Sequence, residues 1–275
     1  MNIRLRLIVV CVTASLAIAF GAITLNSAVR PPKINYQIST LDNGLKVVLS
    51  EDHSTPIVHV ELWYAVGSKN ELPGRTGFAH LFEHLMFKGS KNVQSDQHLA
   101  FISRVGGDGN AYTTEDATVF WQTVPVQYLP LVLWLEADRM ATLQIDQKAL
   151  ESEREVVKEE RRWRYENEPF GLLAEIVFDH AFTTHPYKHT TIGAMADLEA
   201  AEINDVKEFY DTYYVPENAT LVIVGDIDVS NTYQMIEHYF GRVPKASQSV
   251  LRDIPREPLQ RAERRITVQA DNWPL

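Results

Sequence analysis

The sequence has almost no cysteine: Cys11 is the only one among 275 residues, and it lies in an apolar run at the N-terminus. An intramolecular disulfide is therefore excluded, and any metal site must use His, Asp or Glu ligands. Basic residues are also scarce: the sequence has 26 Lys and Arg but 36 Asp and Glu, so the net charge is −10. This deficit argues against a nucleic-acid partner, because nucleic-acid binding depends on clustered Lys and Arg.

Glycine and proline are limited to 13 residues each, which excludes collagen-like and low-complexity chains. Hydrophobic residues make up 45% of the sequence and charged residues 23%, as in an ordinary globular protein. The length allows one large domain or two small ones.

The first 28 residues have the pattern of an export signal. Arg4 and Arg6 precede a nearly uninterrupted apolar stretch over residues 7–25, and Pro31 and Pro32 follow it. A basic segment, an apolar segment and a small residue at the cleavage site are typical of exported proteins. The apolar stretch is also nearly long enough to cross a bilayer, so an uncleaved N-terminal membrane anchor is the alternative. In both cases we expect the body of the protein in the periplasm or the extracellular space.

Between residues 35 and 244 the sequence predicts alternating strands and helices. Asp42-Asn43-Gly44 separates two short β-type runs, which favours a tight hairpin. Apolar residues at every second position over 57–66 predict a strand with one buried face. Further strands are expected over 110–113, 117–124 and 220–225, and helices over 76–88, 96–106, 131–140, 147–165, 171–181, 203–214 and 230–240, the last with Ser230 as N-cap. This irregular order predicts an α+β fold, with helices packed on a mixed, largely antiparallel sheet.

After residue 244 the composition changes to Lys, Arg, Ser, Gln and three further prolines, which is typical of a linker. A strand-like run follows over residues 265–270. We therefore expect residues 35–244 to form one domain, and residues 245–275 to form a linker and the start of a truncated second domain. A C-terminal extension that pairs at a sheet edge is the alternative.

The helix expected from residue 76 carries His80, Glu83 and His84. Positions i, i+3 and i+4 of a helix lie on one face within a single turn, so two imidazoles and a carboxylate share one patch of space. Two imidazoles can bind one Zn²⁺, while the glutamate stands beside the metal and takes a proton from its water. The alternative is a pair of histidines on a buried helix. Burying three ionisable groups there without a metal would be costly.

A catalytic zinc site also needs a third protein ligand. The helix expected over residues 147–165 offers Glu153 and Glu160, which are seven residues apart and share a face. Glu159 is adjacent to Glu160 but points about 100° away from it. Most of this helix has the charge pattern of a solvated surface. Spacing alone does not select the ligand.

Two segments closely resemble the pitrilysin-like M16 zinc peptidases, which include mitochondrial processing peptidase and insulin-degrading enzyme. They are residues 77–89, around His80-Leu81-Phe82-Glu83-His84, and residues 153–160. The resemblance implies that Glu160 is the third zinc ligand beside His80 and His84. It also implies that Glu83 is the catalytic base and that Glu153 is a carboxylate that supports the site from behind the ligands.

A third segment, from Gly106-Gly107 through Asn110-Ala111-Tyr112 to Phe120, also resembles this family. The resemblance implies that Asn110, Ala111 and Tyr112 form an edge strand that binds an extended substrate peptide through backbone hydrogen bonds. The segment His185-Pro186-Tyr187, with Gly193, matches a recurrent family segment whose role stays open.

We therefore expect a zinc metalloendopeptidase domain that hydrolyses extended peptides or proteins. Members of the resembled family contain two or more homologous domains, and the second one supplies an Arg and a Tyr that help hold the substrate carbonyl. Full activity is thus expected to need a second M16 domain in cis or in trans. The alternative is a catalytically inactive M16-like structural or peptide-binding subunit. Metal storage is a weaker reading, because three ligands and Glu83 suit catalysis better than a closed site.

Overall fold

The computed structural model describes residues 33–246 and 249–269, so the expected leader over residues 1–28 lies outside the described residues. Six strands form one sheet in the order β1-β2-β6-β3-β5-β4. They are β1 (Gln37–Thr40), β2 (Lys46–Glu51), β3 (Ile57–Tyr64), β4 (Asp108–Thr113), β5 (Thr118–Pro125) and β6 (Ala219–Gly225). Neighbouring strands are antiparallel except β2 and β6, which are parallel.

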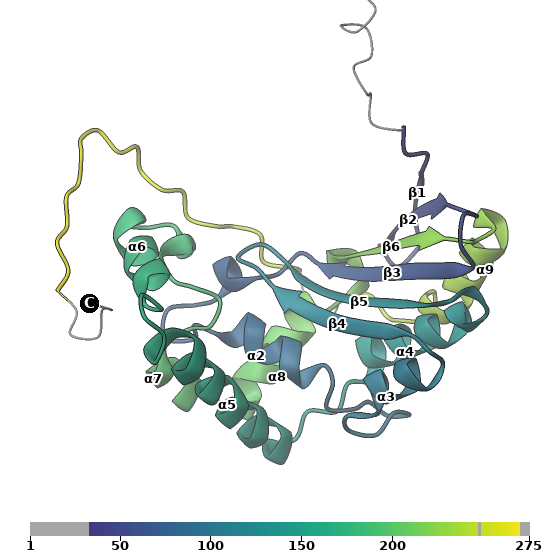
Figure 1. Cartoon of the computed structure of the whole chain (residues 1–275), viewed down its shortest axis with the longest axis horizontal. Coiled ribbons are helices and arrows are strands. Elements are labelled where there is room, and N and C mark those ends of the chain that lie inside the picture. The colour runs from purple at the N-terminus through teal and green to yellow at the C-terminus, as the bar shows by residue number, and fades with distance from the viewer. Residues whose placement is uncertain (1–32, 247–248, 270–275) are drawn as a thin grey trace, which may run out of the picture. The chain divides into compact units, whose positions relative to one another are not determined.

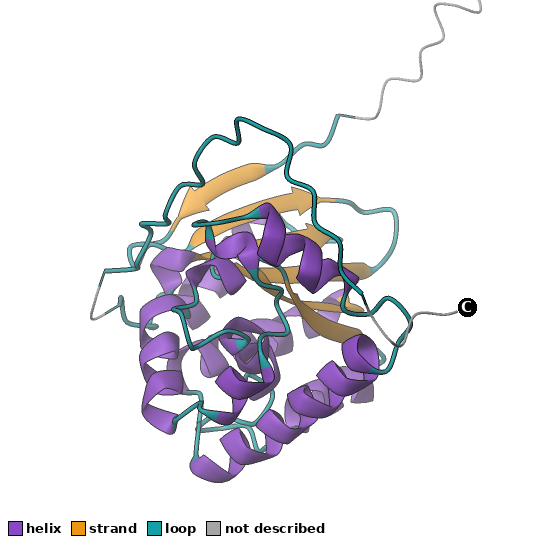
Figure 2. Ribbon diagram, turned by 90° about the vertical axis from the view of Figure 1, so that its left-hand side faces the viewer, coloured by secondary structure: helices purple, strands orange, loops and turns teal. Residues whose placement is uncertain are grey.

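Most helices lie on one side of this sheet (Figures 1 and 2). They are α2 (Phe78–Leu85), α3 (Gln97–Arg104), α4 (Leu129–Thr142), α5 (Gln147–Arg161), α6 (Leu173–Ala181), α7 (Met195–Glu199), α8 (Ile203–Tyr213) and α9 (Val229–Phe240). The central strand β3 shows the cause, since Val58, Val60 and Leu62 are fully buried while Trp63 on the other face is partly exposed. Alternate apolar residues therefore select the face that the helices cover. The α+β prediction is confirmed.

Several predicted boundaries differ from the observed ones. Helix α2 ends at Leu85, and turns continue the chain to Gly89, which has φ +108°. The N-cap of α9 is Asp228, whose carboxylate accepts a hydrogen bond from N of Asn231 at 2.8 Å, so the prediction of Ser230 is wrong. Aspartate and serine cap helices about equally well, and the sequence offers both within three positions.

Beyond residue 244 the described part, 245–246 and 249–269, contains no helix or strand. The expected strand over 265–270 is therefore wrong for residues 265–269. Ile266 and Val268 instead line a groove with Leu173 and Val177 of α6. A strand without a neighbouring strand is not stable, and alternating apolar residues do not by themselves provide that neighbour. Among the described residues, no helix is long and apolar enough to cross a membrane.

Candidate metal centre

Helix α2 starts where two segments of the chain approach each other closely. Gly77 precedes the helix with φ +88°, and a Cβ atom there would lie 2.8 Å from the carbonyl oxygen of Ile192. A Cβ atom on Gly193 would lie 2.4 Å from N of Gly77. Both positions therefore require glycine. This contact holds the segment around Gly193 against the start of the helix that carries His80 and His84.

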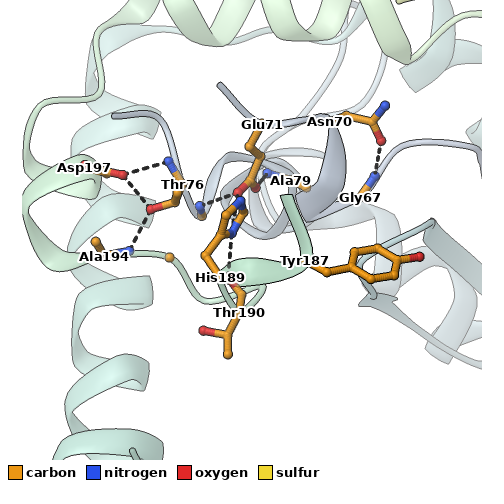
Figure 3. A network of polar contacts seen from close by, with 12 residues as sticks. Gly67, Asn70, Glu71, Thr76, Ala79, Tyr187, His189, Thr190, Ala194 and Asp197 are labelled. Carbon is orange, nitrogen blue, oxygen red and sulfur yellow. Dashed lines mark hydrogen bonds and ion pairs between the residues drawn. The ribbon is translucent and has the colours of Figure 1, made fainter. Parts of the chain in front are cut away.

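The first backbone N–H groups of α2 meet a buried carboxylate (Figure 3). Glu71 accepts hydrogen bonds from N of Gly77 at 2.9 Å and from N of Ala79 at 2.8 Å. His189 Nδ1 lies 3.6 Å from the same carboxylate. Burial raises the pKa of Glu71 well above its usual value, although the two hydrogen bonds act in the opposite direction. Glu71 thus satisfies N–H groups that the helix itself leaves without partners.

Three of the predicted site residues converge at one point. His80 and His84 come from one turn of α2, and Glu160 comes from the last turn of α5. Glu160 Oε2 lies 3.6 Å from His80 Nε2 and 3.5 Å from His84 Nε2. The three donor atoms all lie within 4.8 Å of one another. One nitrogen from each ring and one carboxylate oxygen therefore face a common centre.

This donor set fits zinc. A tetrahedral Zn²⁺ with bonds of about 2.0–2.1 Å holds two donors about 3.4 Å apart, close to the 3.5 and 3.6 Å found between Glu160 and the two imidazoles. Two imidazoles and one carboxylate also form a known ligand set of catalytic zinc sites, which leave a fourth position open. The geometry therefore supports the predicted ligands.

Glu153 lies behind His84 rather than among the three donors. Its Oε2 lies 3.3 Å from His84 Nδ1, and its Oε1 lies 2.8 Å from Lys88 Nζ. Burial acts to raise the pKa of Glu153, but the hydrogen bonds from His84 and Lys88 outweigh it and lower the pKa. A carboxylate in this place can hold an imidazole in one orientation. His80 differs, because within the described structure its Nδ1 is buried without a hydrogen-bond partner.

The pKa values of the two imidazoles are shifted in opposite directions. Burial and the neighbouring charge of His84 lower the pKa of His80 to about 4. Burial acts to lower the pKa of His84 as well, but hydrogen bonds to Glu153 and Glu160 outweigh it and raise the pKa to about 9. The hydrogen bond with His84 lowers the pKa of Glu160. Because ligands must be deprotonated, zinc binding to this set would release the proton of His84.

Glu83 lines the same cleft, which has a volume of about 500 Å³. Burial raises the pKa of Glu83, although a hydrogen bond from Thr113 acts to lower it. The predicted substrate-binding residues Asn110, Ala111 and Tyr112 line the cleft as well. They belong to β4, which is one of the two edge strands of the described sheet and pairs with β5 on its inner side. An edge strand therefore runs beside the predicted metal ligands.

Comparison with known families identifies the chain. The model of insulinase, peptidase family M16, matches residues 46–195, which is more than half of the sequence. The chain belongs to peptidase family M16. A second model, the M16 inactive domain, matches residues 200–274. In this M16 chain β6 lies within residues 200–274, but it pairs with β2 and β3. The region matched by the second model therefore contributes a strand to the same sheet as the region matched by the first.

Relatives and solved structures agree with the M16 assignment. The zinc protease PqqE of Helicobacter pylori is 35% identical over 234 residues, which cover 84% of this chain and 53% of the relative. A crystal structure of a protease from Helicobacter pylori has a TM-score of 0.80 at 34% identity, and the match covers 82% of this chain and 55% of that one. The first half of the periplasmic protease PqqL from Escherichia coli has a TM-score of 0.72 at 27% identity, with coverage of 82% and 50%. The chain spans about half the length of the curated relatives it matches.

Sequence reasoning missed three residues that contact predicted site residues: Lys88, Thr113 and Arg164. It also missed Glu71, which accepts hydrogen bonds at the start of the helix that carries His80 and His84. Lys88 stands four positions after His84, so helical spacing could have indicated that it shares the face. Glu71 lies outside the helix that it caps, and no local pattern marks it. Thr113 follows Tyr112 in a segment that resembles the family, but its contact with Glu83 depends on how β4 lies against α2.

Proposed function

We propose that this M16 chain is the zinc-binding domain of a metalloendopeptidase that hydrolyses peptide bonds in extended peptides. The observation that carries the proposal is the convergence of His80 Nε2, His84 Nε2 and Glu160 Oε2 from two helices. These three residues would hold the zinc ion, and Glu153 would orient His84. When bound, zinc would supply a Lewis acid and a water that ionises near neutral pH.

Glu83 is the proposed general base. It lines the cleft beside the three ligands, one residue before His84 on the same helical turn. In this role its carboxylate accepts a proton from the attacking water and returns it to the leaving amine. Burial raises the pKa of Glu83, which is the direction that suits a carboxylate that takes up and returns a proton.

The substrate is proposed to be an extended peptide that adds to the edge of β4. Asn110, Ala111 and Tyr112 occupy this edge and line the cleft. Backbone hydrogen bonds along an edge strand give affinity with little demand on sequence. The scissile bond of such a peptide would lie close to Glu83 and the metal ligands, because all of them share one cleft.

A second M16 domain or subunit is proposed as a partner for full activity. The relatives support it, because the match covers only 53% of one and 48% of another, so both carry further sequence beyond the part that matches. Export is proposed as well, from the leader pattern over residues 1–28 and from the likeness to a protein described as a periplasmic protease.

The test of the peptidase proposal compares the wild type with Glu83→Gln and Glu159→Gln, each with and without a second M16 domain. The Glu159 side chain is 71% exposed and pairs with Arg162, so its variant is a surface control. Metal analysis should show zinc in all three proteins. In a fluorogenic peptide assay, the wild type and Glu159→Gln should hydrolyse the peptide, and Glu83→Gln should not. Full hydrolysis by Glu83→Gln would overturn the proposal. A wild type without zinc or turnover would favour an inactive peptide-binding subunit.

A further inference from the structure

The carboxylate of Glu83 has one hydrogen-bond partner among the described residues, and that partner comes from the substrate-binding edge. Thr113 Oγ1 donates a hydrogen bond to Glu83 Oε2 at 2.7 Å. Thr113 is the last residue of β4, so the bond joins the proposed substrate strand to the proposed base. We propose that Thr113 is a positioning residue that holds Glu83 for proton transfer, a role that rests on the proposed peptidase function.

Glu83 needs such a partner because its backbone does not fix its carboxylate. Helix α2 sets the position of the Glu83 Cα atom, but three side-chain torsions separate that atom from the oxygens. The hydrogen bond to Oε2 restricts these torsions and, within the described structure, leaves Oε1 without a hydrogen bond. Oε1 is therefore the oxygen available to accept a proton, and Thr113 determines where it points.

Thr113 can serve as a fixed point because the turn that follows it is tied to the body of the domain. The carbonyl oxygen of Thr114 accepts a hydrogen bond from N of Ser68 at 3.3 Å. Asp116 forms an ion pair with Lys69 and accepts a hydrogen bond from Tyr187 Oη at 2.7 Å. These contacts come from residues 68–69 and from Tyr187, so two separate segments hold the turn after β4 in place.

Tyr187 belongs to the segment His185-Pro186-Tyr187, to which the sequence assigned no role. Its hydroxyl donates to Asp116, and this hydrogen bond raises the pKa of Tyr187 to about 12. The segment thus reaches the end of β4 from a part of the chain some 70 residues later. It supports the turn that carries Thr113 rather than the metal ligands directly.

Two substitutions at Thr113 separate the hydroxyl from the shape of the side chain. Thr113→Val keeps the branched shape without the donor, and Thr113→Ser keeps the donor. We expect Thr113→Val to lower kcat by about 10- to 100-fold, the cost of a misplacement of about 1 Å, with KM and zinc content unchanged. Thr113→Ser should restore kcat to within about threefold of the wild type, because it keeps the hydroxyl.

Thr123→Val is the matched control, because Thr123 lies on the neighbouring strand and its hydroxyl contacts His59 Nδ1 at 2.8 Å instead of Glu83. It should leave kcat unchanged. Equal losses in Thr113→Val and Thr123→Val, or no rescue by Thr113→Ser, would assign Thr113 a structural role only and overturn the proposal.

A double-mutant cycle tests the contact without activity or metal. Urea unfolding of the zinc-free chain should show that Thr113→Val raises the unfolding equilibrium constant about tenfold, as expected for a hydrogen bond to a charged group. In the Glu83→Ala background the same change should have less than about a twofold effect. Equal effects in both backgrounds would refute the contact. A zinc-loaded wild type that shows no turnover even with a second M16 domain present would instead refute the peptidase function, and this cycle would still report the contact separately.

Discussion

Replacing Glu71 by alanine should destabilise the domain more than removing any exposed helix cap. The Glu71 side chain is completely buried and accepts hydrogen bonds from two N–H groups at the start of α2. Asp146 caps α5 in the same way, accepting from N of Ala149 at 2.7 Å, but this cap is exposed. The two positions therefore present the same chemistry in two environments.

The expected magnitudes follow from burial. Glu71→Ala leaves two buried N–H groups without acceptors, at about 1–3 kcal/mol each, so we expect a loss of about 2–6 kcal/mol. Glu71→Gln keeps one acceptor oxygen and should lose about 1–3 kcal/mol. Asp146→Ala should lose about 1 kcal/mol, because water replaces the lost carboxylate.

Urea unfolding of the zinc-free chain at neutral pH measures these differences, provided that the m-value is the same for all variants. The order of loss should be Glu71→Ala, then Glu71→Gln, then Asp146→Ala. If Glu71→Ala loses no more than Asp146→Ala, the N–H groups of α2 do not depend on Glu71, and our account of how the helix begins is wrong.

Two further predictions concern the proposed metal ligands. Loss of a residue that only hydrogen-bonds a ligand typically weakens metal binding by about 10- to 100-fold. Glu160→Gln should weaken zinc binding by more than this, whereas Glu159→Gln should not change it. Equal zinc affinities of the two variants in a chelator competition would contradict the ligand assignment. In the zinc-free chain the histidine pair should make the folded state most stable near pH 6.5. Below that pH, folded His80 binds fewer protons than unfolded His80, so stability falls as the pH drops. Between pH 6.5 and about 9, folded His84 binds more protons than unfolded His84, so stability falls as the pH rises. His84→Gln should abolish the decline between pH 6.5 and 9 in urea unfolding, and a decline of the same size in that variant would contradict the raised pKa.

The parts of the fold that the sequence predicts well are those that local periodicity determines. Strand β3 has apolar residues at every second position, and those residues are buried. The errors occur where a contact outside the segment decides the structure. Residues 265–269 alternate like a strand but pair with no strand in the part of the chain that the structure describes. Helix α7 has only five residues, which is too short for a helical period to show.

The candidate site divides in the same way. His80, Glu83 and His84 lie within one helical turn, so their shared face follows from the sequence alone. Glu160 needed the family resemblance, because spacing in its helix also allowed Glu153. The difference between the two carboxylates arises from how α5 crosses α2, which places Glu160 toward both Nε2 atoms and Glu153 toward His84 Nδ1. Crossing geometry of this kind is a property of the packed domain, not of either helix.

The same dependence on packing explains why a five-residue segment, residues 67–71, bears on both halves of the site. At its start, a Cβ atom on Gly67 would lie 2.3 Å from the carbonyl oxygen of Thr114, so the segment packs directly on the turn after β4. At its end, Glu71 accepts the first N–H groups of the helix that carries Glu83. Residues 67–71 therefore contact both the turn after the proposed substrate strand and the start of the helix that carries the proposed base. A substitution such as Gly67→Ala should move both together, which links the position of Glu83 to that of the peptide it is proposed to act on.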